Sequence, residues 1–227
     1  MIATRLARWL ADPAHWTGPE GLAIEALVHL RYCAVAVALA AVIAVPLGVL
    51  VAATGRGSAL VVGASNALRA LPTLGLVTLL VLGFGLGEGP ALAGLVVLAV
   101  PSILSGTHAG LRSVPPDAAD AATGMGMTRW QRLRRVELPN ALPLLLGGVR
   151  SAVLQVVATA TVAAYVGLGG LGRVLLDGLK ISDYAQMGSA AIVIAALAVV
   201  LDLALAGLTR ALVPRGVRLA ARSGGAR

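Results

Sequence analysis

The residues that could carry out chemistry are few in this chain. It holds three histidines and one cysteine among 227 residues. The cysteine, Cys33, has no cysteine or histidine neighbour at metal-ligand spacing, so we expect no metal site. Ser102 or Ser105 with His108 is the one combination of serine and histidine inside an apolar run. This combination leaves an intramembrane hydrolase open as an alternative, although we expect no catalytic residue.

Glycine-rich stretches raise the question of nucleotide binding. A P-loop requires Gly, four residues, Gly-Lys and then Ser or Thr, but the one lysine, Lys180, directly follows Leu179. Gly167, Gly169 and Gly172 match the spacing of a dinucleotide fingerprint, yet that motif follows a strand, and these glycines follow a long apolar run. We interpret them, together with Gly170, as a flexible external turn. We expect this chain to bind no cofactor.

The connection 112–141 has the pattern of a compact helical knob. Pro116 suits the first position of a helix, and Asp117 and Asp120 place negative charge near its positive end. Gly126 follows the end of this helix, and a capping-box pattern then predicts a second short helix over 129–135. The sequence therefore predicts a protein-binding element that projects from whatever body carries it.

The composition indicates that this body is an integral membrane protein. The chain is 58% hydrophobic and 12% charged, against about 45–50% and about 25% in soluble domains. So few charges cannot solvate the surface of a water-soluble globule. The net charge of +8 would suggest nucleic acid in a soluble protein, whereas basic residues mark cytoplasmic loops in a membrane protein. We expect membrane lipid, and no nucleic acid, as a partner.

Five apolar runs are long enough to cross a membrane, which takes about 20 residues as a helix. No strand-like alternation competes with them, so the predicted fold is all-α. The second run is a weaker candidate for a membrane span, because polar residues interrupt it, and its effective start lies near Pro72. In the fourth run, Pro143 lies in the first turn. We predict an N-terminal extracytoplasmic or interfacial segment over 1–25, a transmembrane domain over 26–209 and a basic tail over 210–227. The five predicted spans are 32–53, 59–83, 91–111, 142–166 and 188–212.

Basic residues divide unevenly between the two sides that five spans define. The connection 112–141 and the tail carry five arginines each, and the turn between the first two spans carries Arg56, so 11 of 18 basic residues share one side. The positive-inside rule places that side in the cytoplasm of a bacterial inner membrane. The N-terminus is then outside and the C-terminus inside. Residues 1–16 suit an amphipathic helix on the membrane surface and, equally, a loosely ordered terminus.

Two charged residues interrupt the spans. Arg150 and Asp202 both lie roughly 14 Å from the cytoplasmic face at a rise of about 1.5 Å per residue. Charges inside a membrane are costly and are usually paired. We therefore predict an ion pair between these two side chains, with Arg69 as an alternative partner for Asp202.

The knob resembles the EAA loop of type-I ABC importer permeases, whose pattern is Glu-Ala-Ala, three residues, Gly, nine residues and Ile-x-Leu-Pro. The spacing fits throughout, with Asp in place of Glu at 120 and Val in place of Ile at 136. The resemblance implies a five-span type-I permease core in which the loop couples to an ATPase. The residues to which it assigns this coupling are Pro116, Asp117, Asp120, Ala121, Ala122, Gly126, Val136, Leu138 and Pro139.

Three further motifs resemble permeases of the osmoprotectant group, which handle glycine betaine, carnitine and choline. They begin at Asn66, Gly110 and Gly167, and the last, in which the resemblance places an outer gate, also resembles methionine permeases. The resemblance implies that ATP is hydrolysed on two copies of a separate ATPase subunit. It also implies a second permease chain, identical or a sister, and an extracytoplasmic solute-binding protein. A channel without an ATPase is a further alternative, but it leaves the loop unexplained.

Solute recognition by this chain alone is disfavoured by its aromatic content of 3%. Quaternary ammonium groups are usually held in aromatic cages, and only Tyr32, Phe84 and Tyr165 lie at or near span ends. A separate binding protein would therefore select the solute. Gln155 and Thr159 share a helix face and form, with Tyr165, a candidate translocation path. Packing between helices explains Gln155 and Thr159 equally well.

Overall fold

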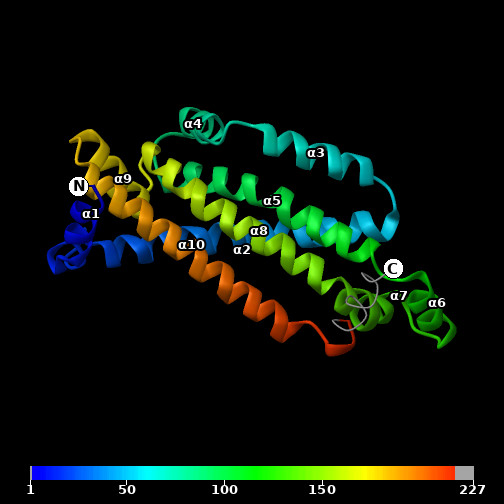
Figure 1. Ribbon diagram of the computed structural model, residues 1–227. Coiled ribbons are helices and arrows are strands. Elements are labelled where there is room, and N and C mark those ends of the chain that lie inside the picture. Colours follow the sequence, from blue (N-terminus) through cyan, green and yellow to red (C-terminus); the bar gives the residue numbers. More distant parts are fainter. Residues whose placement is uncertain (1, 218–227) are drawn as a thin grey trace.

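A computed structural model describes residues 2–217, apart from the side chains at 60, 62 and 69. The described residues form helices joined by turns, with no strand among them, as predicted. Four helical stretches are long and apolar enough to cross a membrane, and they lie side by side in one bundle (Figure 1). They are α2 (Leu22–Thr54), α5 (Glu88–Arg112), the stretch 129–166 that contains α8 (Leu138–Ala163), and α10 (Tyr184–Leu212).

Helices α2 and α5 run in the same direction. The hydroxyl of Tyr32, early in α2, donates to the carboxylate of Glu88 at the start of α5, and Gly48 and Thr107 lie against each other near the opposite ends. The segment between two parallel helices must return along the bundle. It does so as two helices, α3 (Ser58–Ala70) and α4 (Thr73–Phe84), in place of one continuous helix over 59–83. Helix α4 begins directly after Pro72, where the sequence placed the effective start of the second run. Pro72 separates the two helices, because proline disfavours helical geometry in the residue before it.

The structure also moves two predicted boundaries. Helix α2 begins at Leu22, so the predicted N-terminal segment 1–25 already contains its first turn. No loop precedes residue 142, because α7 (Arg129–Arg132) continues through a π-helical segment (Leu133–Glu137) directly into α8. Pro139 lies directly after the π-helical segment, at the second residue of α8, and Pro143 lies inside α8.

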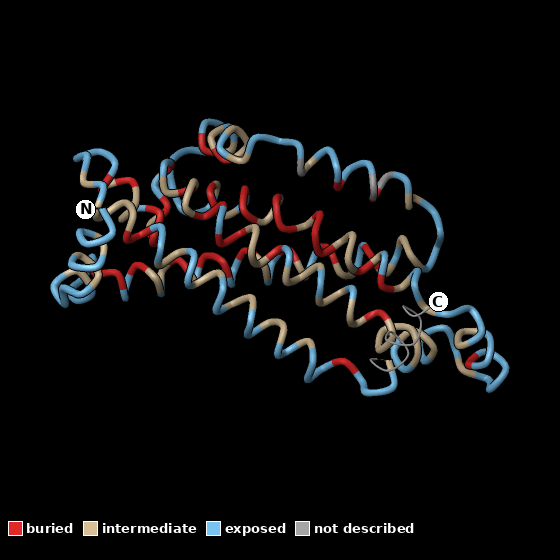
Figure 2. The backbone as a smooth tube through the Cα atoms, viewed as in Figure 1, coloured by how far each residue is buried: buried red, intermediate tan, exposed pale blue. Residues whose placement is uncertain are grey.

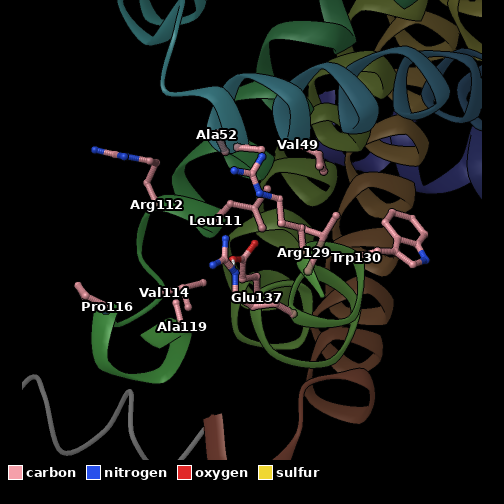
Figure 3. A pocket seen from close by; sticks show the side chains of 13 residues that line it. Val49, Ala52, Leu111, Arg112, Val114, Pro116, Ala119, Arg129, Trp130 and Glu137 are labelled. Carbon is pink, nitrogen blue, oxygen red and sulfur yellow. Dashed lines mark hydrogen bonds and ion pairs between the residues drawn. The ribbon is translucent and has the colours of Figure 1, made fainter. Parts of the chain in front are cut away.

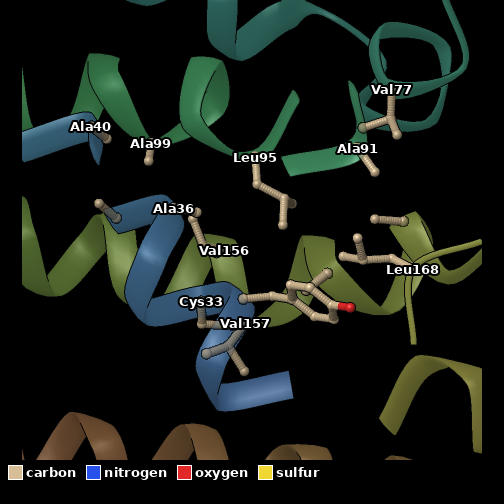
Figure 4. Close-up of a cluster of buried hydrophobic side chains, with 14 of the residues drawn as sticks. Cys33, Ala36, Ala40, Val77, Ala91, Leu95, Ala99, Val156, Val157 and Leu168 are labelled. Atoms are coloured by element: carbon tan, nitrogen blue, oxygen red, sulfur yellow. The ribbon is translucent and has the colours of Figure 1, made fainter. Parts of the chain in front are cut away.

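Small residues allow the central helices to approach closely. Ala36, Ala40, Ala44 and Gly48 recur every four residues along α2 and are all buried. They form one stripe of that helix, and Ala36 and Ala40 are seen between α5 and α8 in Figure 4. Small side chains are typical of helix interfaces in membranes, where close packing takes over the role that hydrophobic burial has in water. Burial is concentrated in α2, α5 and α8, while α10 is mostly exposed or half-buried (Figure 2).

Shorter helices cover one end of the bundle. The amphipathic helix α1 (Ile2–Ala11) lies against α10, where Leu6 fills the space beside Gly188. A 3-10 turn (Pro13–His15) follows it, and the ring of His15 stacks on Trp9 with centroids 4.0 Å apart. A second 3-10 turn (Ala164–Val166) and helix α9 (Leu171–Lys180) complete this end. Of the two alternatives for residues 1–16, the helix is therefore present.

Candidate functional site

The predicted knob consists of α6 (Pro116–Gly124) and α7, at the end of the bundle opposite α1 and α9 (Figure 1). Pro116 occupies the first turn of α6, as its fixed backbone geometry favours. Ala122 is buried, whereas Asp117, Asp120 and Ala121 are exposed. At 100° per residue these three exposed positions share one face of α6, and two of them bring negative charge to it. The helix thus exposes an acidic face with small side chains.

The turn after α6 is fixed by backbone geometry and by a cap. Gly126 has a φ of +78°, a conformation that residues other than glycine adopt at a cost. The predicted capping box is present, since Gln131 N donates to Thr128 Oγ1 at 3.3 Å and Thr128 N donates to Gln131 Oε1 at 2.9 Å. Arg132 then donates to Thr123 of α6 at 3.3 Å. These bonds hold α6 and α7 as one unit.

The second half of the loop motif belongs to the helix that enters the bundle. Val136 lies in the π-helical segment, Leu138 and Pro139 begin α8, and all three are half-buried. Arg132 also forms a salt bridge with Glu137 of the π-helical segment at 2.7 Å. The chain is therefore continuously helical from Arg129 of the knob into α8.

Arg150 of α8 and Asp202 of α10 form a salt bridge with two hydrogen bonds. Arg150 Nε donates to one carboxylate oxygen, and a second guanidinium nitrogen donates to the other at 2.5 Å. The side chains are 41% and 28% exposed in the isolated chain. The alternative partner that the sequence suggested, the side chain of Arg69, lies outside the described residues. The pair ties α10, which has few buried residues, to the centre of the bundle.

The polar groups proposed for a translocation path make bonds within and between helices. Ser102 of α5 donates to Gln155 Oε1 at 3.1 Å, and Thr159 donates to the backbone carbonyl of Gln155 at 2.7 Å. Thr159 is buried, whereas Tyr165 is 61% exposed and lies in the 3-10 turn that follows α8. The structure therefore joins Gln155 to Thr159 and Ser102, and leaves Tyr165 apart from them.

The serine and histidine considered for a hydrolase are bonded to other groups. His108 pairs with Ser58 of α3, with Nε2 and Oγ 3.1 Å apart. Ser105 donates to Ser65 of α3, also at 3.1 Å. A hydrolytic serine needs its base within hydrogen-bonding reach, together with a third group that orients the base. These bonds instead connect α3 to α5.

The glycine turn between α8 and α9 is held by residues that the sequence analysis did not select. Gly170, at a φ of +86°, donates its backbone N–H to the buried carboxylate of Glu25 at 2.6 Å. His29, one helical turn further along α2, is bonded through Nε2 to the carbonyl of Val157 at 3.1 Å. The sequence signal for these contacts was a glutamate and a histidine four residues apart at the start of an apolar helix.

The other glycines of this turn have different roles. Gly167 has a φ of +95° with open space around it, whereas a side chain at Gly172 would come within 2.6 Å of the carbonyl of Thr161. Gly169 faces Glu25, since a Cβ atom added at this glycine would lie 3.8 Å from the Glu25 carboxylate. Arg173 of α9 forms a salt bridge with Glu20 at 2.7 Å, and this hydrogen bond raises the pKa of the Arg173 guanidinium. The turn and α9 are therefore fastened to the start of α2.

Comparison with known proteins agrees with this architecture. A family model described as the binding-protein-dependent transport system inner membrane component matches residues 44–218. The chain is 40% identical over 195 residues to the osmoprotectant import permease protein OsmW of Salmonella typhimurium, covering 84% of this chain and 91% of that protein. It is 32% identical over 190 residues to the glycine betaine/carnitine/choline transport system permease protein OpuCB of Bacillus subtilis, covering 84% and 88%.

A solved structure shares the fold. The inward-facing MetNI methionine ABC transporter contains a chain that matches 90% of this chain with 100% of its own length, with a TM-score of 0.76 and 25% identity. The all-α fold predicted from the sequence is thus that of a type-I ABC transporter permease. The family match, the similar permeases and the loop between α5 and α8 agree with one another. The chain belongs to the family of inner membrane components of binding-protein-dependent transport systems.

Proposed function

We propose that this chain is the permease subunit of an ATP-driven importer of compatible solutes such as glycine betaine, carnitine or choline. The observation that carries the solute class is the 40% identity with an osmoprotectant import permease over 84% of the chain. The permeases similar to it in two other bacterial species carry the same class of solute in their names.

In this proposal ATP is hydrolysed on a separate ATPase subunit that contacts the knob. The exposed face of α6 with Asp117, Asp120 and Ala121 is the contact surface. Closure of two ATPase subunits moves α6 and α7, and the continuous helix 129–166 carries this motion into the bundle. The Arg150–Asp202 pair then carries it on to α10. Two knobs are needed for two ATPases, so a second permease chain, identical or a sister, completes the pore.

The proposed topology has five crossings. The described structure contains four long apolar helices, and α3 with α4 supplies the return between the parallel helices α2 and α5. The knob end carries Arg56, Arg112 and the arginines of α7, which supports a cytoplasmic knob and an outer N-terminus. The predicted tail 210–227 is described only as far as residue 217.

Solute selection is assigned to an extracytoplasmic binding protein. The permease supplies a path in which Gln155 and Thr159 face the solute when the bundle opens, with Tyr165 near the outer end. In the described state Gln155 and Thr159 are engaged in bonds of their own. A path of this kind would bind the solute weakly, so the affinity of uptake would be set by the binding protein. The turn of Gly167, Gly169, Gly170 and Gly172 is the proposed outer gate.

Uptake in a host that lacks its own osmoprotectant importers tests the proposal. The chain is expressed with its ATPase, its binding protein and any sister permease, and uptake of labelled glycine betaine, carnitine, choline and methionine is measured. We expect ATP-dependent uptake of at least one of the three quaternary amines. Uptake of methionine alone would overturn the solute class, and uptake that persists without the ATPase would overturn the importer mechanism.

A further inference from the structure

A cavity of about 710 Å³ lies where the knob meets the bundle (Figure 3). One wall is apolar and comes from the last turns of α2 and α5, with Val49, Ala52 and Leu111. The other wall comes from α6 and α7 and contains Arg129 and Trp130. The cavity is therefore amphipathic, with hydrocarbon on the bundle side and positive charge on the knob side.

The charges that line the cavity do not balance. Its lining contains Arg112, Arg129 and Arg132 but only one acidic residue, Glu137. Glu137 is already paired with Arg132. Among the residues that the structure describes, no ion pair or hydrogen bond engages the side chain of Arg112 or Arg129. Arg129 extends across the cavity toward Ala52 (Figure 3). The guanidinium of Arg129 is thus available to an anion in the cavity, and that of Arg112 extends outward at the edge of the cavity (Figure 3).

The position of the cavity selects the kind of anion. It lies at the ends of two apolar helices, α2 and α5, where the hydrocarbon layer of a bilayer gives way to its polar headgroups. Trp130, which is 63% exposed, has the amphipathic character of residues found at that boundary. Basic pockets between helices at this depth suit the phosphate of a lipid headgroup, and an apolar wall suits the adjoining acyl chain. We propose that the cavity binds the headgroup of an anionic phospholipid.

This site differs from the proposed ATPase contact. Pro116 and Ala119 are the residues of α6 that line the cavity, whereas Asp117, Asp120 and Ala121 lie on another face of the same helix. A lipid in the cavity would support the knob from the membrane side while its acidic face stayed free. The inference does not depend on which solute is carried.

Lipid titration of the purified full-length chain in neutral detergent tests the proposal, with binding followed by native mass spectrometry. The probes are phosphatidylglycerol, phosphatidylcholine and inorganic phosphate. We expect preferential binding of phosphatidylglycerol. The double variant Arg112→Gln/Arg129→Gln should weaken it by roughly 25-fold, since each arginine near a membrane surface contributes about fivefold. The matched control Arg56→Gln/Arg215→Gln removes the same charge away from the cavity and should change binding less than about twofold.

A second variant separates the site from a folding defect. Val49→Phe fills the apolar wall and keeps both arginines, and it should also weaken phosphatidylglycerol binding while the melting temperature stays near that of the unchanged chain. Equal losses in the two double variants would show general charge attraction and overturn the proposal. Equal affinity for inorganic phosphate would assign the cavity to a free anion. Displacement of the lipid by the ATPase subunit would assign it to that interface.

Discussion

Glu25 links α2 to the glycine turn before α9 through its carboxylate. It lies in the first turn of α2, it is 6% exposed, and it accepts the N–H of Gly170 from the turn before α9. No other hydrogen-bond acceptor is shown for that N–H, and an unpaired buried donor is costly. His29 adds a bond from the same face of α2 to α8. This small polar cluster therefore fixes where the glycine turn lies.

The variant Glu25→Ala should destabilise the chain by about 1.5–3 kcal/mol, the usual contribution of a buried hydrogen bond to a charged group. Glu25→Gln keeps an acceptor oxygen and should recover part of this loss. Thermal and denaturant unfolding in detergent measure the difference. Glu20→Ala is the control, because its salt bridge with Arg173 is exposed and should contribute less than about 1 kcal/mol. Equal losses at positions 20 and 25 would contradict the assignment.

The sequence allows residue-scale prediction where chemistry makes only one outcome favourable. Arg150 and Asp202 stand out because charges in apolar runs need partners, and their equal depth favoured this pair, with Arg69 as the alternative partner for Asp202. Glu25 was not recognised because a glutamate near a helix start also serves as an ordinary first-turn charge. Its role depends on Gly170, which lies 145 residues away and approaches only in the folded chain.

At the scale of elements, α5 and α8 make the closest contact in the bundle. A side chain at Gly148 would come within 2.6 Å of the carbonyl of Ser102, and one at Gly106 within 2.7 Å of Gly148. Backbone atoms cannot move aside as a flexible side chain can. Two glycines therefore set the distance between these helices.

Gly148→Ala should destabilise the chain by about 1–3 kcal/mol, because the added methyl group overpacks this contact. The neighbouring Gly147 has nothing within 4 Å of its Cβ position. Gly147→Ala should thus be neutral or stabilise by about 0.5–1 kcal/mol through its better helix propensity. Paired unfolding curves measure both variants. A destabilising Gly147→Ala with a harmless Gly148→Ala would show that the helix contact is misplaced.

The knob can be tested as an element by placing bulk on its exposed face. Ala121→Trp should abolish most solute uptake while the ATPase subunit retains its own activity, because the indole ring would block close approach to α6. Met125→Trp adds bulk to a neighbouring residue that is 71% exposed and already large, and it should have little effect. Uptake and ATP hydrolysis in proteoliposomes provide the measurement. Full uptake by Ala121→Trp would contradict the proposed contact.

Element prediction succeeded where apolar length or turn chemistry determined the structure. The long helices, α6 and the capping box of α7 follow from such signals. It failed where two elements meet. The helical stretch 129–166 continues through Pro139 and Pro143, where proline suggested a boundary. Pro72, by contrast, separates α3 from α4 at the effective start that the sequence indicated.

At the scale of the whole molecule, the two ends of the bundle differ in charge. The knob end carries Arg56, Arg112 and the arginines at 129, 132, 134 and 135, and α10 ends there with Arg210. The opposite end carries Arg31 paired with Glu88, and Arg173 paired with Glu20. Arg5 and Arg8 of α1 also lie at this opposite end, and Arg132 at the knob end is itself paired with Glu137. The two ends therefore differ in the number of basic residues, which is larger at the knob end.

Cysteine labelling in intact cells tests the orientation and the number of crossings together. The native Cys33 is 3% exposed and gives little background. A membrane-impermeant maleimide should label Leu86→Cys and Ile181→Cys, at 85% and 69% exposed positions, from outside. Ala59→Cys and Met125→Cys should react only after the membrane is opened. Labelling of positions 59 and 86 from one side would show that α3 and α4 do not cross, and reversal of all four would invert the topology.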